Sequence, residues 1–182
     1  MPDLVIVGSG RCVWEDLEKI WPVECAVMCI NDMIMFYPGE IDHVFSCDGY
    51  MLKYWWAARR PPYKSQFERI PSFHTVDNDQ NVPESYKRHH FVGGGTSGLA
   101  ACFAGLDLGY NHIVLCGVPI DNSGHFWEAP WGATNFQREI ANSEGKIRGD
   151  GRRFWVNAME KFDGRVKSLS GFTKILLGSP LE

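Results

Sequence analysis

The chain has 182 residues, with 22 acidic and 18 basic side chains and a formal net charge of −4. This charge, with an isoelectric point near 5.9, argues against a general nucleic-acid-binding protein, which would normally be basic. A chain of this length can bury a hydrophobic core, so we expect a single domain over residues 1–182. The first segment, MPDLVIVGSG, lacks the basic start of a secretion signal, and no apolar run approaches the roughly 20 residues of a membrane span.

The six cysteines never occur as Cys-x-x-Cys, and most of them lie in apolar stretches. Cysteine in such surroundings behaves as a small hydrophobic residue. We therefore expect reduced cysteines, no zinc site and a cytoplasmic location.

A strand, a glycine turn and a helix are expected first. The segment 3–7 (DLVIV), which is apolar after Asp3, runs directly into Gly8, Ser9 and Gly10. This order is typical of a nucleotide-binding βαβ unit, but a full dinucleotide fingerprint needs a third glycine where this chain has Val13. Gly8 and Gly10 then either meet a ligand at the carboxyl end of the strand or only permit a tight turn.

Two further strands are expected at residues 24–30 and 41–47, and both end in polar residues. Asn31 and Asp32 follow the first strand, and Asp48 follows the second. Carboxyl ends of parallel strands form the ligand-binding edge of an α/β sheet. The Asn31 amide both donates and accepts, which suits a base or a ribose hydroxyl. Alternatively, Asn31 or Asp32 caps the next turn.

The middle of the chain has fewer regular patterns. An aromatic-rich helix is expected from Tyr50, with Arg59 near its end complementing the helix dipole. Residues 61–92 are the least regular part, with a short strand expected at 72–76. We expect no metal at the histidine pair that begins with His89, because adjacent residues on a strand point apart and no third ligand is near.

A glycine-rich turn, a helix and a strand follow in residues 93–121 (GGGTSGLAACFAGLDLGYNHIVLCGVPID). The turn places Gly95, Thr96, Ser97 and Gly98 at the helix start. Unpaired backbone amides and the positive end of the helix dipole gather there and favour an anionic ligand. Thr96 or Ser97 is alternatively a plain N-cap.

Residues 122–151 are predicted to form a long, lid-like loop that contains His125. An amphipathic helix at 152–162, a strand at 165–169 and a closing helix that ends at Gly178 complete the chain. Strands and helices alternate throughout. The expected fold is therefore α/β, a Rossmann-like domain with an open, mostly parallel sheet and helices on both faces.

Three pieces of the sequence resemble one family. They are VIVGSGRCVWEDL, MCINDM and GTSGLAACFAGLDLGYNHIVLCGVPID. They resemble the bacterial sialyltransferases of glycosyltransferase family 42 and the related uncharacterised and phage-borne proteins, which include motility accessory and pterin pyrophosphokinase-like members. The resemblance implies a Rossmann-like domain that binds a CMP-activated sugar without an essential metal or other cofactor.

The resemblance also implies roles for particular residues. The nucleotide-binding set comprises the first glycine turn, the end of the second strand and the start of the central helix: Gly8, Ser9, Gly10, Asn31, Thr96, Ser97 and Gly98. Ser9 stands where the family usually has asparagine, and Asn31 matches the asparagine that contacts the donor. Asp121 stands where the family has an acid after the strand-end glycine. From their positions in the chain, we add Asp48 and Gly95 to the binding set.

The chain departs from the family where the catalytic base is expected. Family members carry a histidine before the penultimate helix and tyrosines in a lid, whereas the segment KIRGDGRRFW has no histidine and residues 122–151 have no tyrosine. His125, in the predicted lid, suits the role of base because imidazole titrates near neutral pH; alternatively it is an ordinary surface or core histidine. Asp121 and His125 are thus the candidate catalytic residues.

Three functions follow from these patterns. The first is a glycosyltransferase-like enzyme that transfers a group from a nucleotide sugar to a hydroxyl acceptor. The second is a pyrophosphokinase-like enzyme in which Asp48 and Asp121 bind Mg²⁺. The third is a non-catalytic, phage-type nucleotide-binding or structural protein. The aromatic-rich segments provide either an acceptor platform or a face for a homo-oligomer.

Overall fold

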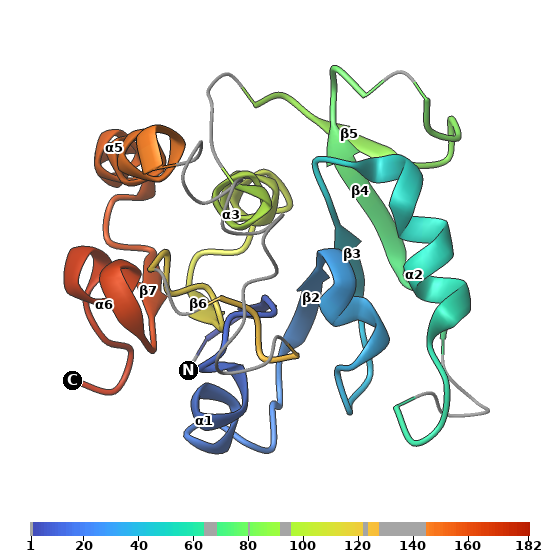
Figure 1. The fold of residues 1–182 in the computed structure, drawn as a ribbon, viewed down its shortest axis with the longest axis horizontal. Coiled ribbons are helices and arrows are strands. Elements are labelled where there is room, and N and C mark those ends of the chain that lie inside the picture. Colours follow the sequence, from blue (N-terminus) through green and yellow to red (C-terminus); the bar gives the residue numbers. More distant parts are fainter. Residues whose placement is uncertain (1, 64–68, 80, 92–95, 122–123, 128–144) are drawn as a thin grey trace.

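The computed structural model describes residues 2–63, 69–79, 81–91, 96–121, 124–127 and 145–182, with only the backbone described for 145–150. Seven parallel strands form one sheet in the order β5-β4-β3-β2-β1-β6-β7 (Figure 1). The strands are β1 (Leu4–Val7), β2 (Ala26–Ile30), β3 (His43–Phe45), β4 (Ser72–Val76), β5 (Lys87–His89), β6 (Ile113–Cys116) and β7 (Val166–Ser168).

Helices cover both faces of the sheet. They are α1 (Val13–Glu18), α2 (Leu52–Ala58), α3 (Ser97–Asp107), α5 (Gly145–Phe162) and α6 (Gly171–Leu177), with short 3₁₀ helices η1 (Asn31–Met35) and η2 (Gly49–Met51). Helices α3 and α5 pack on one face, whereas α1, η1 and α2 pack on the other. This arrangement confirms the predicted α/β fold.

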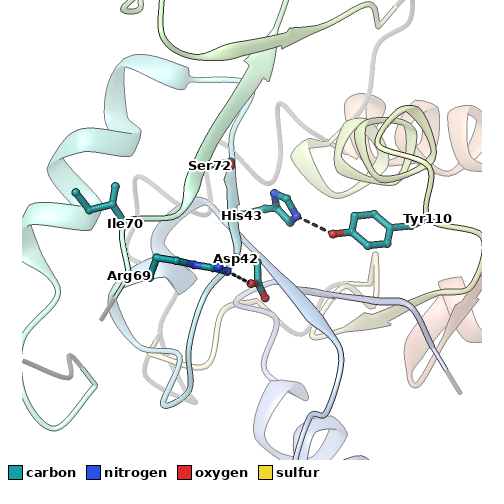
Figure 2. Close-up of a pocket in the computed structure, with 6 residues that line it drawn as sticks. All are labelled: Asp42, His43, Arg69, Ile70, Ser72 and Tyr110. Carbon is teal, nitrogen blue, oxygen red and sulfur yellow. Dashed lines mark hydrogen bonds and ion pairs between the residues drawn. The ribbon is translucent and has the colours of Figure 1, made fainter. Parts of the chain in front are cut away.

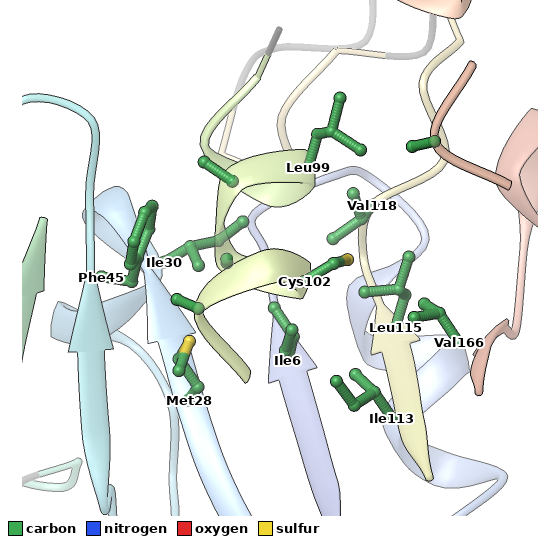
Figure 3. Packing of buried hydrophobic residues seen from close by; sticks show 14 of the residues in the cluster. Ile6, Met28, Ile30, Phe45, Leu99, Cys102, Ile113, Leu115, Val118 and Val166 are labelled. Carbon is green, nitrogen blue, oxygen red and sulfur yellow. The ribbon is translucent and has the colours of Figure 1, made fainter. Parts of the chain in front are cut away.

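The central strands β1, β2 and β6 are buried on both faces, which is why they read as continuous apolar runs. Leu4 and Ile6 of β1 point to the α3 face, while Val5 and Val7 point to the α1 face, and all four are fully buried. Figure 3 shows side chains of α3 above those of β1, β2 and β6. Small residues bring α3 close to the sheet, since a Cβ on Gly105 would lie 2.8 Å from Leu4 Cδ2.

Some elements differ from the sequence prediction. Helix α5 begins at Gly145, so the end of the expected 122–151 loop is helical, whereas residues 122–123 and 128–144 lie outside the described residues. Strand β5 was not expected, because its three polar residues at the sheet edge carry no apolar pattern. The expected strands at 24–30 and 41–47 are shorter at their ends.

Arg59 is not a surface residue that complements a helix dipole. Its side chain is fully buried, and its guanidinium donates to the carbonyl oxygens of Ile34, Tyr37 and Gly39 at 2.7–2.9 Å. These bonds connect the end of α2 to η1 and to the turn that follows it.

None of the six cysteines, all of which are described, forms a disulfide. Among the helices in the described part of the chain, none has the length and apolar character needed to cross a membrane.

Candidate active site

The order of the strands reverses at β1. Strands β2 to β5 lie on one side of it, and β6 and β7 lie on the other. Open α/β sheets bind ligands at this reversal, in the crevice outside the carboxyl ends of the strands. The loops that follow β1 and β6 meet there.

Backbone contacts explain the glycines at this point. Gly8 N donates to Cys116 O and Gly10 N donates to Gly117 O, both at 2.9 Å. A Cβ on Gly8 would lie 2.8 Å from Gly117 O, and one on Gly10 would lie 2.5 Å from Pro119 Cδ. The close approach of the two loops is therefore enough to require glycine at positions 8 and 10, whether or not these residues also contact a ligand.

Gly117 and Gly164 provide a matched pair of substitutions. Both have left-handed backbone, with φ of +63° and +70°. A Cβ on Gly117 would lie 2.4 Å from Gly8 O, whereas one on Gly164 would meet nothing within 4 Å. We expect Gly164→Ala to lower the free energy of unfolding by about 1–2 kcal/mol, the usual cost of that backbone conformation. Gly117→Ala has the same backbone cost, and its Cβ would in addition clash with the backbone oxygen of Gly8.

Urea denaturation of the two variants measures the difference. We expect Gly117→Ala to cost about 1–3 kcal/mol more than Gly164→Ala, the typical cost of overpacking. Equal losses would contradict the close contact between the two loops.

Ser9 connects Asp32 to His125, one of the two candidate catalytic residues. Its hydroxyl donates to Asp32 Oδ1 at 2.7 Å, and the same Oγ lies 2.7 Å from His125 Nδ1. The backbone brings His125 there, because it forms an antiparallel bridge with Gly10 and Phe126 N donates to Ser9 O at 3.0 Å. The sequence prediction included Ser9 and His125 but did not foresee this contact.

Trp127 contacts both Asp32 and His125. Its indole Nε1 donates to Asp32 Oδ2 at 2.7 Å, and its ring stacks on the His125 imidazole with centroids 5.2 Å apart. Phe126, between them in sequence, packs edge-on against Trp14 and Phe36. Backbone, polar and aromatic contacts therefore hold residues 124–127 next to the glycine turn at residues 8–10.

The hydrogen bonds determine which imidazole nitrogen is basic. The Ser9 hydroxyl has a single proton, which it donates to the Asp32 carboxylate. His125 Nδ1 must then carry a hydrogen and donate it to Ser9 Oγ. The lone pair of the neutral ring is consequently on Nε2.

The carboxyl end of β3 orients Asn31. The Ser46 hydroxyl donates to Asn31 Oδ1 at 2.8 Å and accepts from Asp48 N at 3.0 Å. The Asn31 amide oxygen therefore faces Ser46, and its NH₂ group points elsewhere. Asn31 has a φ of +54° and is the first residue of η1, whose N-cap is Ile30.

Thr96 and Ser97 have structural contacts at the start of α3. Thr96 is the N-cap, with its hydroxyl accepting from Leu99 N at 3.4 Å. Ser97 Oγ accepts from Cys47 N at 3.3 Å and so links the helix start to the end of β3. Gly98 is buried, and a Cβ on it would lie 2.8 Å from Val118 Cγ1.

The remaining candidate residues make fewer of the described contacts at this site. The side chains of Asp48 and Asp121 are exposed, and Gly95 lies outside the described residues. Arg152 lies near the loop after β6, where its Nε donates to Ile120 O at 3.4 Å. Within the described ranges, no group of three or more His, Cys, Asp or Glu residues is placed to hold a metal ion.

A cavity of about 410 Å³ lies elsewhere, at the amino ends of β3 and β4 (Figure 2). Its lining residues are Asp42, His43, Arg69, Ile70, Ser72 and Tyr110. The amino ends of the strands lie at the opposite edge of the sheet from their carboxyl ends. Because this fold binds substrates at the carboxyl ends, we do not expect the cavity to be the substrate site.

Comparison with known proteins shows which solved structures share this fold. No protein-family model and no curated protein matches the chain. The sialyltransferase CstII from Campylobacter jejuni in complex with the substrate analogue CMP-3FNeuAc is similar in structure, with a TM-score of 0.60 and 15% identity over 98% of this chain and 86% of that one. The monofunctional α-2,3-sialyltransferase Cst-I from Campylobacter jejuni has a TM-score of 0.62 and 17% identity over 98% and 80% of the two chains.

A further solved structure, of the sialyltransferase CST-II with a trisaccharide acceptor and CMP, has a TM-score of 0.60 and 15% identity over 97% of this chain and 85% of that one. At such identities the likeness shows a shared fold. The resemblance found in the sequence is confirmed at that level.

Proposed function

We propose that the protein is a glycosyltransferase-like enzyme that binds a CMP-type nucleotide sugar and transfers the sugar to a hydroxyl acceptor. The hydrogen-bonded group Asp32–Ser9–His125 carries the proposal, because it puts an oriented imidazole at the strand-order reversal. The fold supports it, since solved structures with this fold are sialyltransferases in complex with CMP or its sugar analogue.

His125 acts as the general base in this proposal. Its Nε2 accepts the proton of the acceptor hydroxyl while that oxygen forms a bond to the anomeric carbon of the sugar. The bond between the anomeric carbon and the phosphate oxygen breaks, and the nucleotide leaves with the electron pair. Asp32, through Ser9, keeps Nδ1 protonated and so keeps Nε2 available.

The start of α3 and Asn31 stabilise the nucleotide. Backbone amides of the first helical turn and the helix dipole favour the negative charge of the leaving phosphate. The Asn31 NH₂ group, which is turned away from Ser46, donates to the donor substrate. This mechanism needs no metal ion, in contrast to pyrophosphoryl transfer with Asp48 and Asp121 as Mg²⁺ ligands.

Replacing His125 by alanine tests the assignment of the base. We expect kcat for sugar transfer to fall about 100- to 10,000-fold, the usual contribution of a general base, with CMP binding retained. Transfer to a hydroxyl acceptor and the thermal shift with CMP are measured in parallel. His112→Ala is the control, because His112 is an exposed histidine that bonds to Asp3. Unchanged turnover in His125→Ala would remove His125 from the mechanism.

Ligand-induced thermal shifts test the substrate class before any acceptor is known. CMP, UDP, GDP, ADP and ATP are compared with and without Mg²⁺. Selective stabilisation by CMP without metal is the expected result. Stabilisation by ATP with Mg²⁺ alone would instead favour the pyrophosphokinase-like alternative, and no stabilisation by any nucleotide would favour the non-catalytic one.

A further inference from the structure

Trp127 is a large aromatic residue that lies outside the hydrophobic core. Its exposed fraction is 50%, the same as that of Trp21. Trp21 packs edge-on against Tyr37, whereas Trp127 contacts two side chains of the candidate active site. Core packing therefore does not explain the tryptophan at position 127.

The contact between Trp127 and Asp32 uses the indole N–H group. Trp127 Nε1 donates to Asp32 Oδ2 at 2.7 Å, and the Ser9 hydroxyl donates to Asp32 Oδ1 at 2.7 Å. An indole N–H can only donate and an ionised carboxylate can only accept, so the direction of each bond is fixed. Both oxygens of Asp32 are thereby held, and the carboxylate cannot turn without breaking a charge-assisted hydrogen bond.

The contact between Trp127 and His125 is a stack of the two rings. Their planes lie 11° from parallel with centroids 5.2 Å apart, which is an offset arrangement. His125 Nδ1 also lies 2.7 Å from Ser9 Oγ. The imidazole is therefore held at one nitrogen and on one face, and Nε2 is the nitrogen that these contacts leave for a substrate.

Four side chains thus form a closed circuit of contacts, in the order Ser9, Asp32, Trp127, His125 and back to Ser9. Phe126 lies between the two stacked residues in sequence and packs edge-on against two other aromatic rings. The backbone that carries both rings is therefore anchored independently of the circuit. Loss of the Trp127 side chain should change the orientation of the imidazole and leave residues 124–127 in place.

The circuit accepts a proton at His125 Nε2 without rearrangement. Nδ1 already donates to Ser9 Oγ, so a hydrogen added at Nε2 reverses none of the existing bonds. The charged ring then lies on the indole face, within the distance of about 6 Å at which an aromatic ring attracts a cation. The Asp32 carboxylate, one hydrogen bond further on, balances the charge.

We propose that Trp127 is a positioning residue for His125. It fixes the Asp32 carboxylate and the plane of the imidazole, and it stabilises the imidazolium that forms when Nε2 takes the proton of the acceptor hydroxyl. The catalytic effect of Trp127 rests on the proposed function, whereas the orientation of the imidazole does not. Trp127 acts on kcat rather than on nucleotide binding, because the imidazolium forms only as the acceptor proton moves.

Nuclear magnetic resonance of the His125 imidazole tests the positioning without a substrate. At about pH 8, above the usual titration range of histidine, we expect the wild-type ring to carry its hydrogen on Nδ1. The stacked indole should shift the carbon-bound ring protons upfield. Trp127→Leu removes both contacts, so the upfield shift should be lost and a population with the hydrogen on Nε2 should arise.

Two further variants separate the contacts and control for exposure. Trp127→Phe keeps a ring for stacking and loses the N–H donor, so part of the upfield shift should remain. Trp21→Leu removes an equally exposed tryptophan and should leave the His125 spectrum unchanged. If Trp127→Leu did not fold, Trp127→Phe would carry the comparison through the loss of the bond to Asp32.

Kinetics test the catalytic consequence. We expect kcat for sugar transfer to fall about 10- to 100-fold in Trp127→Leu, the usual scale for a misplaced catalytic group, with CMP binding retained. Trp127→Phe should lose less, and Trp21→Leu should keep the wild-type kcat. In the His125→Ala background, Trp127→Leu should have no further effect, because a residue that acts through His125 then has nothing to orient.

Three results would overturn the proposal. They are an unchanged His125 spectrum in Trp127→Leu, the same kcat in Trp127→Leu and Trp21→Leu, and an equal loss of kcat from Trp127→Leu with and without His125. Failure of the proposed function has a different signature, namely unchanged turnover in His125→Ala. In that case the imidazole spectrum alone decides whether Trp127 orients His125.

Discussion

Replacing Asp16 by alanine is expected to lower the free energy of unfolding by about 3–5 kcal/mol, the usual result of removing one partner from a buried charged network. The Asp16 side chain is fully buried. Its Oδ2 accepts from Gly117 N at 3.0 Å and from the Ser170 hydroxyl at 2.6 Å, and its Oδ1 accepts from Lys19 Nζ at 3.1 Å. One carboxylate thus joins α1 to the loop after β6 and to the start of α6, and alanine would leave those donors without it.

Glu18→Ala is the matched control, since Glu18 is an exposed acid on the same helix. Urea denaturation of both variants at neutral pH gives the comparison. We expect Glu18→Ala to change the free energy of unfolding by less than about 0.5 kcal/mol. A similarly small change in Asp16→Ala would show that the network is dispensable.

The second large effect is expected at Arg59. Arg59→Ala removes a buried guanidinium that donates to three backbone carbonyls, one in η1 and two in the turn after it, and hydrogen bonds to charged groups contribute about 1.5–3 kcal/mol each. We expect a loss of at least about 3 kcal/mol in the free energy of unfolding.

The neighbouring Arg60 offers a direct comparison. It is exposed, and its guanidinium donates to the carbonyl oxygens of Ala57 and Arg59. Arg60→Ala should therefore cost less than about 1 kcal/mol. If the two variants unfold at the same urea concentration, the buried contacts of Arg59 contribute little.

The fold was predictable where a strand is buried on both faces. Apolar runs such as residues 4–7 and 113–116 can be recognised in the sequence, and a glycine follows each of them. Strand β5 was missed because it is an edge strand of three residues, Lys87–His89, whose packing depends on His74 and Asp107 from other elements. Short polar strands carry no local signal of this kind.

The candidate site was predictable in its parts but not in its connections. Ser9, Asn31 and His125 were named from glycine turns, strand ends and the predicted lid. That Ser9 bonds to both Asp32 and His125 depends on residues 23 and 116 positions away, respectively, which no local pattern reports. Trp127 was noticed only as an aromatic in an irregular segment, and its bond to Asp32 is of the same long-range kind.

The position of β1 in the sheet has a consequence for synthesis on the ribosome. β1 is made before the other six strands of this sheet, yet it pairs with both β2 and β6, and Leu4 aligns with Ala26 on one side and Ile113 on the other. The strands from β1 to β5 can assemble early, but one edge of β1 stays unpaired until β6 emerges. An unpaired apolar edge is a template for association with other chains. Nascent chains that stall before Ile113 are therefore the species most in need of a chaperone.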